Sequence, residues 1–161
     1  METSEQINRI EYFLRNVMIK ELSKVVELEL SYMQFVIMGQ AVEVLGSFLD
    51  TKPMKAKGQS AKRFASGVTK LFGGRYRLLN ENYYLYDKLR NQMTHTFIPG
   101  GDLLLINRNE NKNGYKHLEV TEGKLVLISE FFYEDICKAV DRLCEALKTG
   151  KIKPKNIGYQ E

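Results

Sequence analysis

Apolar residues recur every three or four positions through most of the first fifty residues, which is the period of an α-helix. No proline interrupts the stretch from Ser4 to Asp50, and no glycine precedes Gly39. The repeat is too long for one average helix, so we expect a break between Ile19 and Glu29 or one unusually long helix. Apolar side chains between Leu28 and Met38 occupy almost every side. This stretch is therefore expected to be buried on more than one face, within a bundle or in a dimer contact.

Further helices are predicted on both sides of the middle of the chain. A loop at 52–58 precedes a helix from Ser60 to the glycine pair at 73–74. Another helix is predicted from about 83 to 97, and a last one from about 130 to 148. Pro99 and the glycines after it should stop the helix at 83–97. That helix carries apolar residues at steps of four on one face: Leu85, Leu89, Met93 and Phe97.

Between residues 102 and 129 the pattern changes to short β-prone runs separated by turn residues. We expect a small antiparallel meander inserted before the last helix. The sequence as a whole predicts a single, mainly α-helical domain over residues 1–148, built as an up-and-down bundle of four to five helices. Residues 149–161 are polar and contain a proline, and we expect them to form a flexible basic tail.

Composition and cysteine usage favour a cytoplasmic domain. The charged residues near the N-terminus are atypical of a secretory signal, and no apolar run approaches the length of a membrane span. No membrane partner is expected. Cys137 and Cys144 lie seven residues apart on one predicted helix, too far apart to form a disulfide and without the spacing of metal ligands. We expect reduced core cysteines and neither a metal nor another cofactor.

The positive charge is concentrated in one segment. Residues 51–80 contain eight basic residues and no acidic one. This block immediately precedes the helix at 83–97, and such a block favours a polyanionic partner. A solvated basic face on a loop would look the same in sequence.

The helix at 83–97 also carries the candidate chemistry. Asn91 and His95 are four residues apart and share a face, and Arg90 lies on the adjoining stripe. Metal-independent RNA cleavage needs a base for the 2′-hydroxyl and a cation for the phosphate charge of the transition state. His95 suits the first role and Arg90 the second. Asn91 would orient the imidazole or bind a phosphate oxygen.

These residues resemble a known family. Arg90-Asn91-Gln92-Met93-Thr94-His95 is similar to the R-(N/D/H)-x-x-x-H signature of HEPN domains, which include many metal-independent ribonucleases. Glu43-Val44-Leu45-Gly46 is similar to the ending of the family's first helix. The resemblance covers about residues 30–147. It implies a HEPN-like helical bundle, catalytic roles for Arg90, Asn91 and His95, and a homodimer in which two motifs face each other.

The same resemblance implies an endoribonuclease that leaves a 2′,3′-cyclic phosphate and a 5′-hydroxyl. It also implies a role as a toxin or in phage defence, with an antitoxin or another regulatory protein as partner. In one subfamily a tyrosine two residues after the histidine is modified to silence the enzyme. Phe97 occupies this position here, so that control is not expected. Many HEPN relatives are inactive adaptors, although these usually lack the arginine or histidine.

Single-stranded RNA is the partner that the basic block and the neighbouring aromatic residues favour. Each of these residues could also have a purely structural role. Arg90 could form a salt bridge with Asp87 or Asp141, His95 could cap its helix, and His117 could simply face solvent. Glu43 is expected on the surface or as a buried partner of the motif. The expected RNA-binding residues are Lys62, Arg63, Lys70, Arg75, Arg77 and Tyr84.

Two other functions fit the same sequence. The first is a non-catalytic HEPN-like module that binds RNA or a partner protein through the basic block at 52–77. The second is a structural dimer whose basic face serves only solubility. Other catalytic signatures, including phosphate-binding loops and His-Glu-x-x-His, are absent from the sequence.

Overall fold

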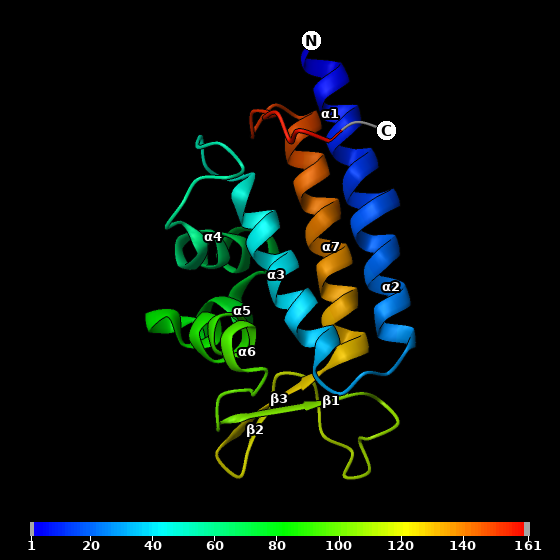
Figure 1. The fold of residues 1–161 in the computed structure, drawn as a ribbon, viewed down its shortest axis with the longest axis vertical. Coiled ribbons are helices and arrows are strands. Elements are labelled where there is room, and N and C mark those ends of the chain that lie inside the picture. The colour runs from blue at the N-terminus through cyan, green and yellow to red at the C-terminus, as the bar shows by residue number, and fades with distance from the viewer. Residues whose placement is uncertain (1, 160–161) are drawn as a thin grey trace.

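A computed structural model describes residues 2–159 of the chain. Its long helices lie side by side along the longest axis, with both described ends of the chain at one end of the molecule and a small sheet at the other (Figure 1). The first long helix is continuous, because α1 (Thr3–Tyr12) and α2 (Lys20–Glu27) are joined by the π-helical segment η1 (Phe13–Ile19). It ends at Glu27, inside the interval expected for a break. The chain then returns as α3 (Met33–Ser47).

The last long helix, α7 (Ser129–Lys148), follows the sheet and packs against α2 and α3. Short helices form a second layer on the other side of α3 and lie across it (Figure 1). The up-and-down arrangement is therefore confined to the long helices, although the prediction of a mainly α-helical fold is confirmed. The short helices are α4 (Ser60–Gly67), η2 (Val68–Phe72), α5 (Gly74–Leu79), η3 (Glu81–Tyr83), η4 (Tyr86–Asn91) and α6 (Gln92–Thr96).

Glycines set how closely α3 and α4 approach. A Cβ atom on Gly46 would lie 1.7 Å from the carbonyl oxygen of Arg63, and one on Gly67 would lie 2.8 Å from the carbonyl oxygen of Val42. Both positions accept only a hydrogen atom, so backbone meets backbone at this crossing. The second layer is held close to α3 by this contact.

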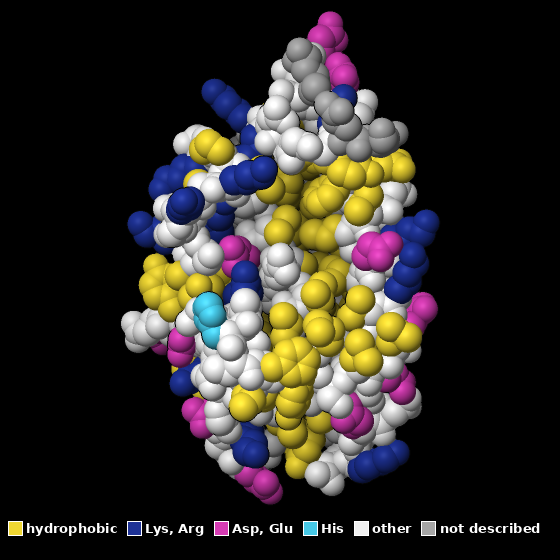
Figure 2. Space-filling view, in the orientation of Figure 1, with side chains coloured by type: hydrophobic (Ala, Val, Ile, Leu, Met, Phe, Trp, Pro, Cys, Tyr) yellow, Lys and Arg dark blue, Asp and Glu magenta, His cyan; other side chains and the backbone are white. Residues whose placement is uncertain are grey.

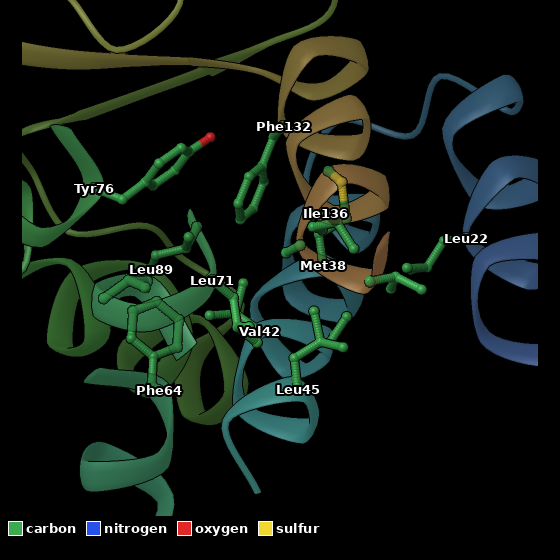
Figure 3. Close-up of a cluster of buried hydrophobic side chains, with 14 of the residues drawn as sticks. Leu22, Met38, Val42, Leu45, Phe64, Leu71, Tyr76, Leu89, Phe132 and Ile136 are labelled. Atoms are coloured by element: carbon green, nitrogen blue, oxygen red, sulfur yellow. The ribbon is translucent and has the colours of Figure 1, made fainter. Parts of the chain in front are cut away.

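Buried apolar side chains from the long helices and from most of the short ones form one core. Phe132 and Ile136 of α7 face Met38 and Val42 of α3 in this core (Figure 3). Phe64 of α4 enters it from the second layer. This core fixes the position of α3 between the other long helices and the short ones. α3 in turn supports the helix that carries Arg90 and His95.

The sheet differs from the expected meander. Strands β1 (Leu103–Ile106) and β3 (Lys124–Ile128) pair in parallel, and β2 (Val120–Thr121) pairs antiparallel with β3, giving the order β1-β3-β2. The prediction of an all-antiparallel meander is therefore wrong. Parallel strands need a long crossover, and residues 107–123 provide it: an irregular excursion at 107–119 is followed by the short strand β2.

The described part of the expected tail is packed against the helices. Lys155 Nζ lies 3.0 Å from Asp50 Oδ1 and donates to the carbonyl oxygens of Ser47 and Lys52. Tyr159 packs its ring 5.3 Å from the ring of Phe13. Residues 149–159 thus differ from the expectation of a free tail, because the lysine finds acceptors at the end of α3. Residues 160 and 161 lie outside the described part.

Candidate functional site

The helix at 84–96 carries Arg90 and Asn91, which are half-buried, and His95, which is exposed. Leu85, Leu89 and Met93 are fully buried, as their spacing predicted. The fourth member of that face, Phe97, is instead 48% exposed. The helix ends before it reaches Pro99, because Phe97 adopts a left-handed conformation with φ of 59°.

Arg90 forms an ion pair with Glu43 across the interface between the two layers. Its Nε donates to Glu43 Oε2 over 2.9 Å, and the two side chains are only 17% and 19% exposed. Gly39, one turn before Glu43 on α3, lies against Arg90: a Cβ atom there would be 3.6 Å from Arg90 Cα, an ordinary van der Waals contact. Of the expected interpretations, Glu43 as the partner of the motif is confirmed. Arg90 pairs with neither Asp87 nor Asp141.

Thr94 holds the same guanidinium from the other side. Its hydroxyl donates to the Arg90 carbonyl oxygen over 2.6 Å and accepts a hydrogen bond from Arg90 Nη1. Arg90 is therefore fixed at Nε and Nη1. Its Nη2 amino group has no hydrogen-bond partner within residues 2–159 and is available to an anion.

His95 lies in the last turn of α6 and is exposed to solvent. In the part of the chain that the structure describes, its ring accepts and donates no hydrogen bond. Asn91 does not orient it. The Asn91 amide instead makes a long contact of 3.4 Å with Asp87 Oδ1.

An apolar surface adjoins the candidate site. The rings of Phe97 and Tyr32 meet edge to face with centroids 6.4 Å apart, and both are partly exposed. Ile98, Met33 and Leu28 are also exposed, Leu28 to 67%. Exposed apolar side chains of this size are uncommon in one contiguous area of a monomeric protein.

The basic block is only partly available for binding. Lys62, Lys70 and Arg77 are exposed. Arg75 is exposed, but its Nη2 donates to the carbonyl oxygen of Leu118 over 2.8 Å. Lys and Arg side chains gather over the loop between α3 and α4 in the upper left of Figure 2. Tyr84 is half-buried, and its hydroxyl donates to Asp102 Oδ2 over 3.1 Å.

Arg63 does not belong to this exposed surface, and its expected role in RNA binding is wrong. Its side chain is buried, and its Nε lies 2.8 Å from Asp50 Oδ2. The remaining N–H groups donate to the carbonyl oxygens of Pro53 and Met54. Arg63 thus closes the loop between α3 and α4 from inside, a role that its place in a run of basic residues conceals.

His117 also differs from expectation, since it is largely buried rather than facing solvent. Its Nδ1 accepts the Ile128 N–H over 3.0 Å, so the neutral ring carries its proton on Nε2. Nε2 lies 2.9 Å from the Tyr76 hydroxyl, which donates to Asp135 Oδ2 over 2.6 Å. Burial raises the pKa of Tyr76, and the neighbouring Asp135 carboxylate raises it further. Although burial opposes it, hydrogen bonds from His117 and Tyr76 lower the pKa of Asp135.

This Tyr76–His117–Asp135 cluster joins the excursion at 107–119 to α5 and α7. Its members are far apart in sequence and share no motif, so the sequence gave no signal for it. Their hydrogen bonds are satisfied by one another, and the cluster fixes the position of the sheet below the helices.

Within residues 2–159 there is no group of three or more His, Cys, Asp or Glu side chains suited to hold a metal ion. The helices described by the structure include none with the length and apolar character needed to cross a membrane. Cys137 and Cys144 both lie on α7 as free thiols, Cys144 buried. Comparison of the chain with known protein families, with curated proteins and with solved structures finds no match.

Proposed function

We propose that the protein is a metal-independent endoribonuclease of HEPN type, with Arg90 and His95 as its catalytic residues. One observation carries the proposal. Glu43 and Thr94 hold the Arg90 guanidinium in place while its Nη2 group stays available, and the unpaired imidazole of His95 lies one turn further along the same helix end. Phosphodiester cleavage by an internal hydroxyl requires a base for that hydroxyl and a cation for the phosphate, and these two side chains would supply them.

The chemistry follows from these two groups. His95 removes the proton from a ribose 2′-hydroxyl, and the 2′-oxygen attacks the adjacent phosphorus. Arg90 Nη2 donates to a phosphate oxygen, whose negative charge grows in the transition state. The bond from phosphorus to the 5′-oxygen breaks, and that oxygen takes up a proton. The products are a 2′,3′-cyclic phosphate and a 5′-hydroxyl.

A second copy of the chain would complete this site. In a single chain His95 lies open to water, and water weakens the electrostatic stabilisation of a transition state. The apolar surface at Leu28–Met33, Phe97 and Ile98 adjoins it. Figure 2 shows an apolar strip running down this face between α3 and the α1–α2 helix, and the groove there has a volume of about 290 Å³. Pairing through this strip would bring two motifs together, and His95 of the second copy would supply the acid.

The exposed part of the basic block supports RNA as substrate. Lys62, Lys70 and Arg77 make no ion pair with a carboxylate in the described residues, so they can pair with phosphates. A non-catalytic module that binds RNA through this surface is the second candidate. It predicts that RNA binding weakens with salt and survives His95→Ala.

The test is cleavage of single-stranded RNA by the purified protein in the presence of EDTA. We expect the wild-type protein to cut and His95→Ala to lose at least a hundredfold in rate, since a general base contributes about 10²–10⁴-fold. Lys112→Ala, an exposed residue after β1, is the control and should cut at the wild-type rate. Loss of activity in EDTA, or equal rates in His95→Ala and Lys112→Ala, rejects the nuclease mechanism. In the latter case, salt-sensitive binding that Lys62→Gln/Arg77→Gln removes would favour the binding module.

A further inference from the structure

A cavity separate from the Arg90–His95 site lies at the end of the molecule opposite the sheet. It has a volume of about 590 Å³ and lies between the end of α3, η2, the C-terminal half of α7 and residues 151–155. Figure 1 shows the chain crossing this end after α7. The volume falls within the range of about 300–1,000 Å³ that is usual for small-molecule sites.

Positively charged groups line the cavity. Lys70, Lys151 and Lys153 are exposed at its walls, and no carboxylate of residues 2–159 lies within ion-pair distance of them. Arg142 uses one N–H group to donate to the carbonyl oxygen of Leu71 and keeps its other donors. Four cations from three separate elements therefore converge on one space.

The acid in this lining is already neutralised. Asp50 accepts hydrogen bonds from Arg63 over 2.8 Å, from Lys155 over 3.0 Å and from the backbone N–H of Lys52. Burial raises the pKa of Asp50, but these donors outweigh it and lower the pKa to about 2. The carboxylate is thus committed to holding the loop and residue 155 in place. The net charge that the cavity presents to a ligand remains positive.

One wall of the cavity is apolar. Leu49 and Ile152 are half-buried, and both line this space. Inorganic anions gain nothing from such a wall, whereas a ring attached to a phosphate would cover it and leave water. The combination of a cationic side and an apolar side selects ligands that carry both kinds of group.

We propose that this cavity binds a phosphorylated ligand of nucleotide size, with its phosphates on Lys70, Arg142, Lys151 and Lys153 and its ring on Leu49 and Ile152. The site takes a multiply charged ligand better than a singly charged one, because each further phosphate meets another cation. None of its residues belongs to the Arg90–His95 helix, although Lys70 is also part of the basic block that we propose to bind RNA. A free nucleotide fits better than an RNA strand, because the lysines surround a cavity and do not line an extended groove.

Isothermal titration calorimetry with ATP, AMP, adenosine and pyrophosphate tests the assignment. We expect ATP to bind most tightly, AMP more weakly, and adenosine to give no measurable binding at millimolar concentration. Pyrophosphate should bind more weakly than ATP, because it leaves the apolar wall exposed. Absence of ATP binding, or pyrophosphate binding as tightly as ATP, overturns the proposal.

The matched variants are Lys151→Ala/Lys153→Ala and Lys20→Ala/Lys112→Ala, which remove the same charge at the cavity and far from it. The first pair should lower ATP affinity at least tenfold, and the second should leave it within twofold of wild type. Equal affinities in the two pairs would overturn the site. So would a single-stranded RNA oligonucleotide whose binding depends on Lys151 and Lys153 while ATP binding does not. Cleavage by wild type and His95→Ala, measured separately, reports on the nuclease without involving these positions.

Discussion

At the scale of the residue, the position of each charged group depends on which partner the fold supplies. Arg63 and Lys62 are neighbours in a basic run, yet Arg63 is buried against Asp50 while Lys62 is exposed. From the sequence, both are expected to bind RNA. Arg63 donates to the carbonyl oxygens of Pro53 and Met54, which lie in a loop. The spacing of residues along a helix does not predict where such a loop folds back. For Glu43 the sequence left two alternatives, a surface carboxylate or a buried partner of the motif, and the ion pair with Arg90 decides for the second.

Asp50 should make the protein sensitive to acid. Its pKa is lowered from 3.8 to about 2 in the folded state, so its stabilisation is present above about pH 4 and is lost as pH falls towards 2. The free energy of unfolding should therefore fall by at most ~2 kcal/mol over that window on this account. Asp50→Asn should be less stable at pH 7 and show a shallower fall. Urea unfolding at pH 7, 5 and 3 measures this, and parallel pH profiles for the two proteins would contradict it.

Arg90 is expected to have a structural role besides its catalytic one. Arg90→Ala leaves the mostly buried carboxylate of Glu43 without its partner, and the free energy of unfolding should fall by ~1–3 kcal/mol. Glu43→Gln/Arg90→Ala should recover part of that loss, because no buried charge remains. RNA cleavage should stay absent in both variants. Recovery of cleavage together with stability would show that Arg90 serves only to pair with Glu43.

At the scale of the element, the periodic helices could be predicted and the strand pairing could not. The buried face at Leu85, Leu89 and Met93 and the bounds of α7 agree with the sequence pattern. β1 and β3 were located, whereas the run at 115–120, expected as the middle strand, is irregular up to β2 at Val120–Thr121. The apolar pattern of β1 and β3 is the same in parallel and antiparallel sheets. In the folded chain His117 accepts the Ile128 N–H and so holds the excursion against the end of β3. That contact joins residues distant in sequence.

The crossing of α3 and α4 should fail when Gly46 acquires a side chain. Its Cβ would lie 1.7 Å from the Arg63 carbonyl oxygen, so the helices must separate, and Gly46→Ala should destabilise by ~3 kcal/mol or more. Gly39→Ala is the control on the same helix, since its Cβ would meet Arg90 Cα at an ordinary 3.6 Å. The melting temperatures of the two variants, measured by thermal unfolding, test this. A Gly46→Ala protein as stable as Gly39→Ala would show that the crossing is not tight.

At the scale of the whole molecule, the helical layers leave one apolar strip uncovered beside the candidate site. The sequence indicated it, since residues 28–38 carry apolar side chains on almost every side. The structure buries the part that faces α7 and leaves Leu28 and Met33 exposed. Burial of this strip between two copies would lower the apolar surface in contact with water and enclose His95.

We expect the protein to be a dimer, and we expect charged substitutions on the strip to make it a monomer. Leu28→Glu/Met33→Glu places two carboxylates per chain in the contact, and we expect at least a tenfold weaker association with loss of RNA cleavage. Leu78→Glu, at an exposed leucine of α5, should remain dimeric. Sedimentation velocity over a range of concentrations measures this. A monomeric wild-type protein that still cuts RNA would contradict the shared site.

The chemical nature of the product ends is the sharpest test of RNA cleavage by His95 and Arg90. A defined single-stranded RNA oligonucleotide is digested in EDTA, and the fragments are weighed by mass spectrometry. Cleavage by His95 and Arg90 predicts 2′,3′-cyclic phosphate and 5′-hydroxyl ends, and no cut where a 2′-deoxynucleotide replaces the attacking ribose. Fragments with 3′-hydroxyl and 5′-phosphate ends, or cleavage at the 2′-deoxynucleotide, would contradict it.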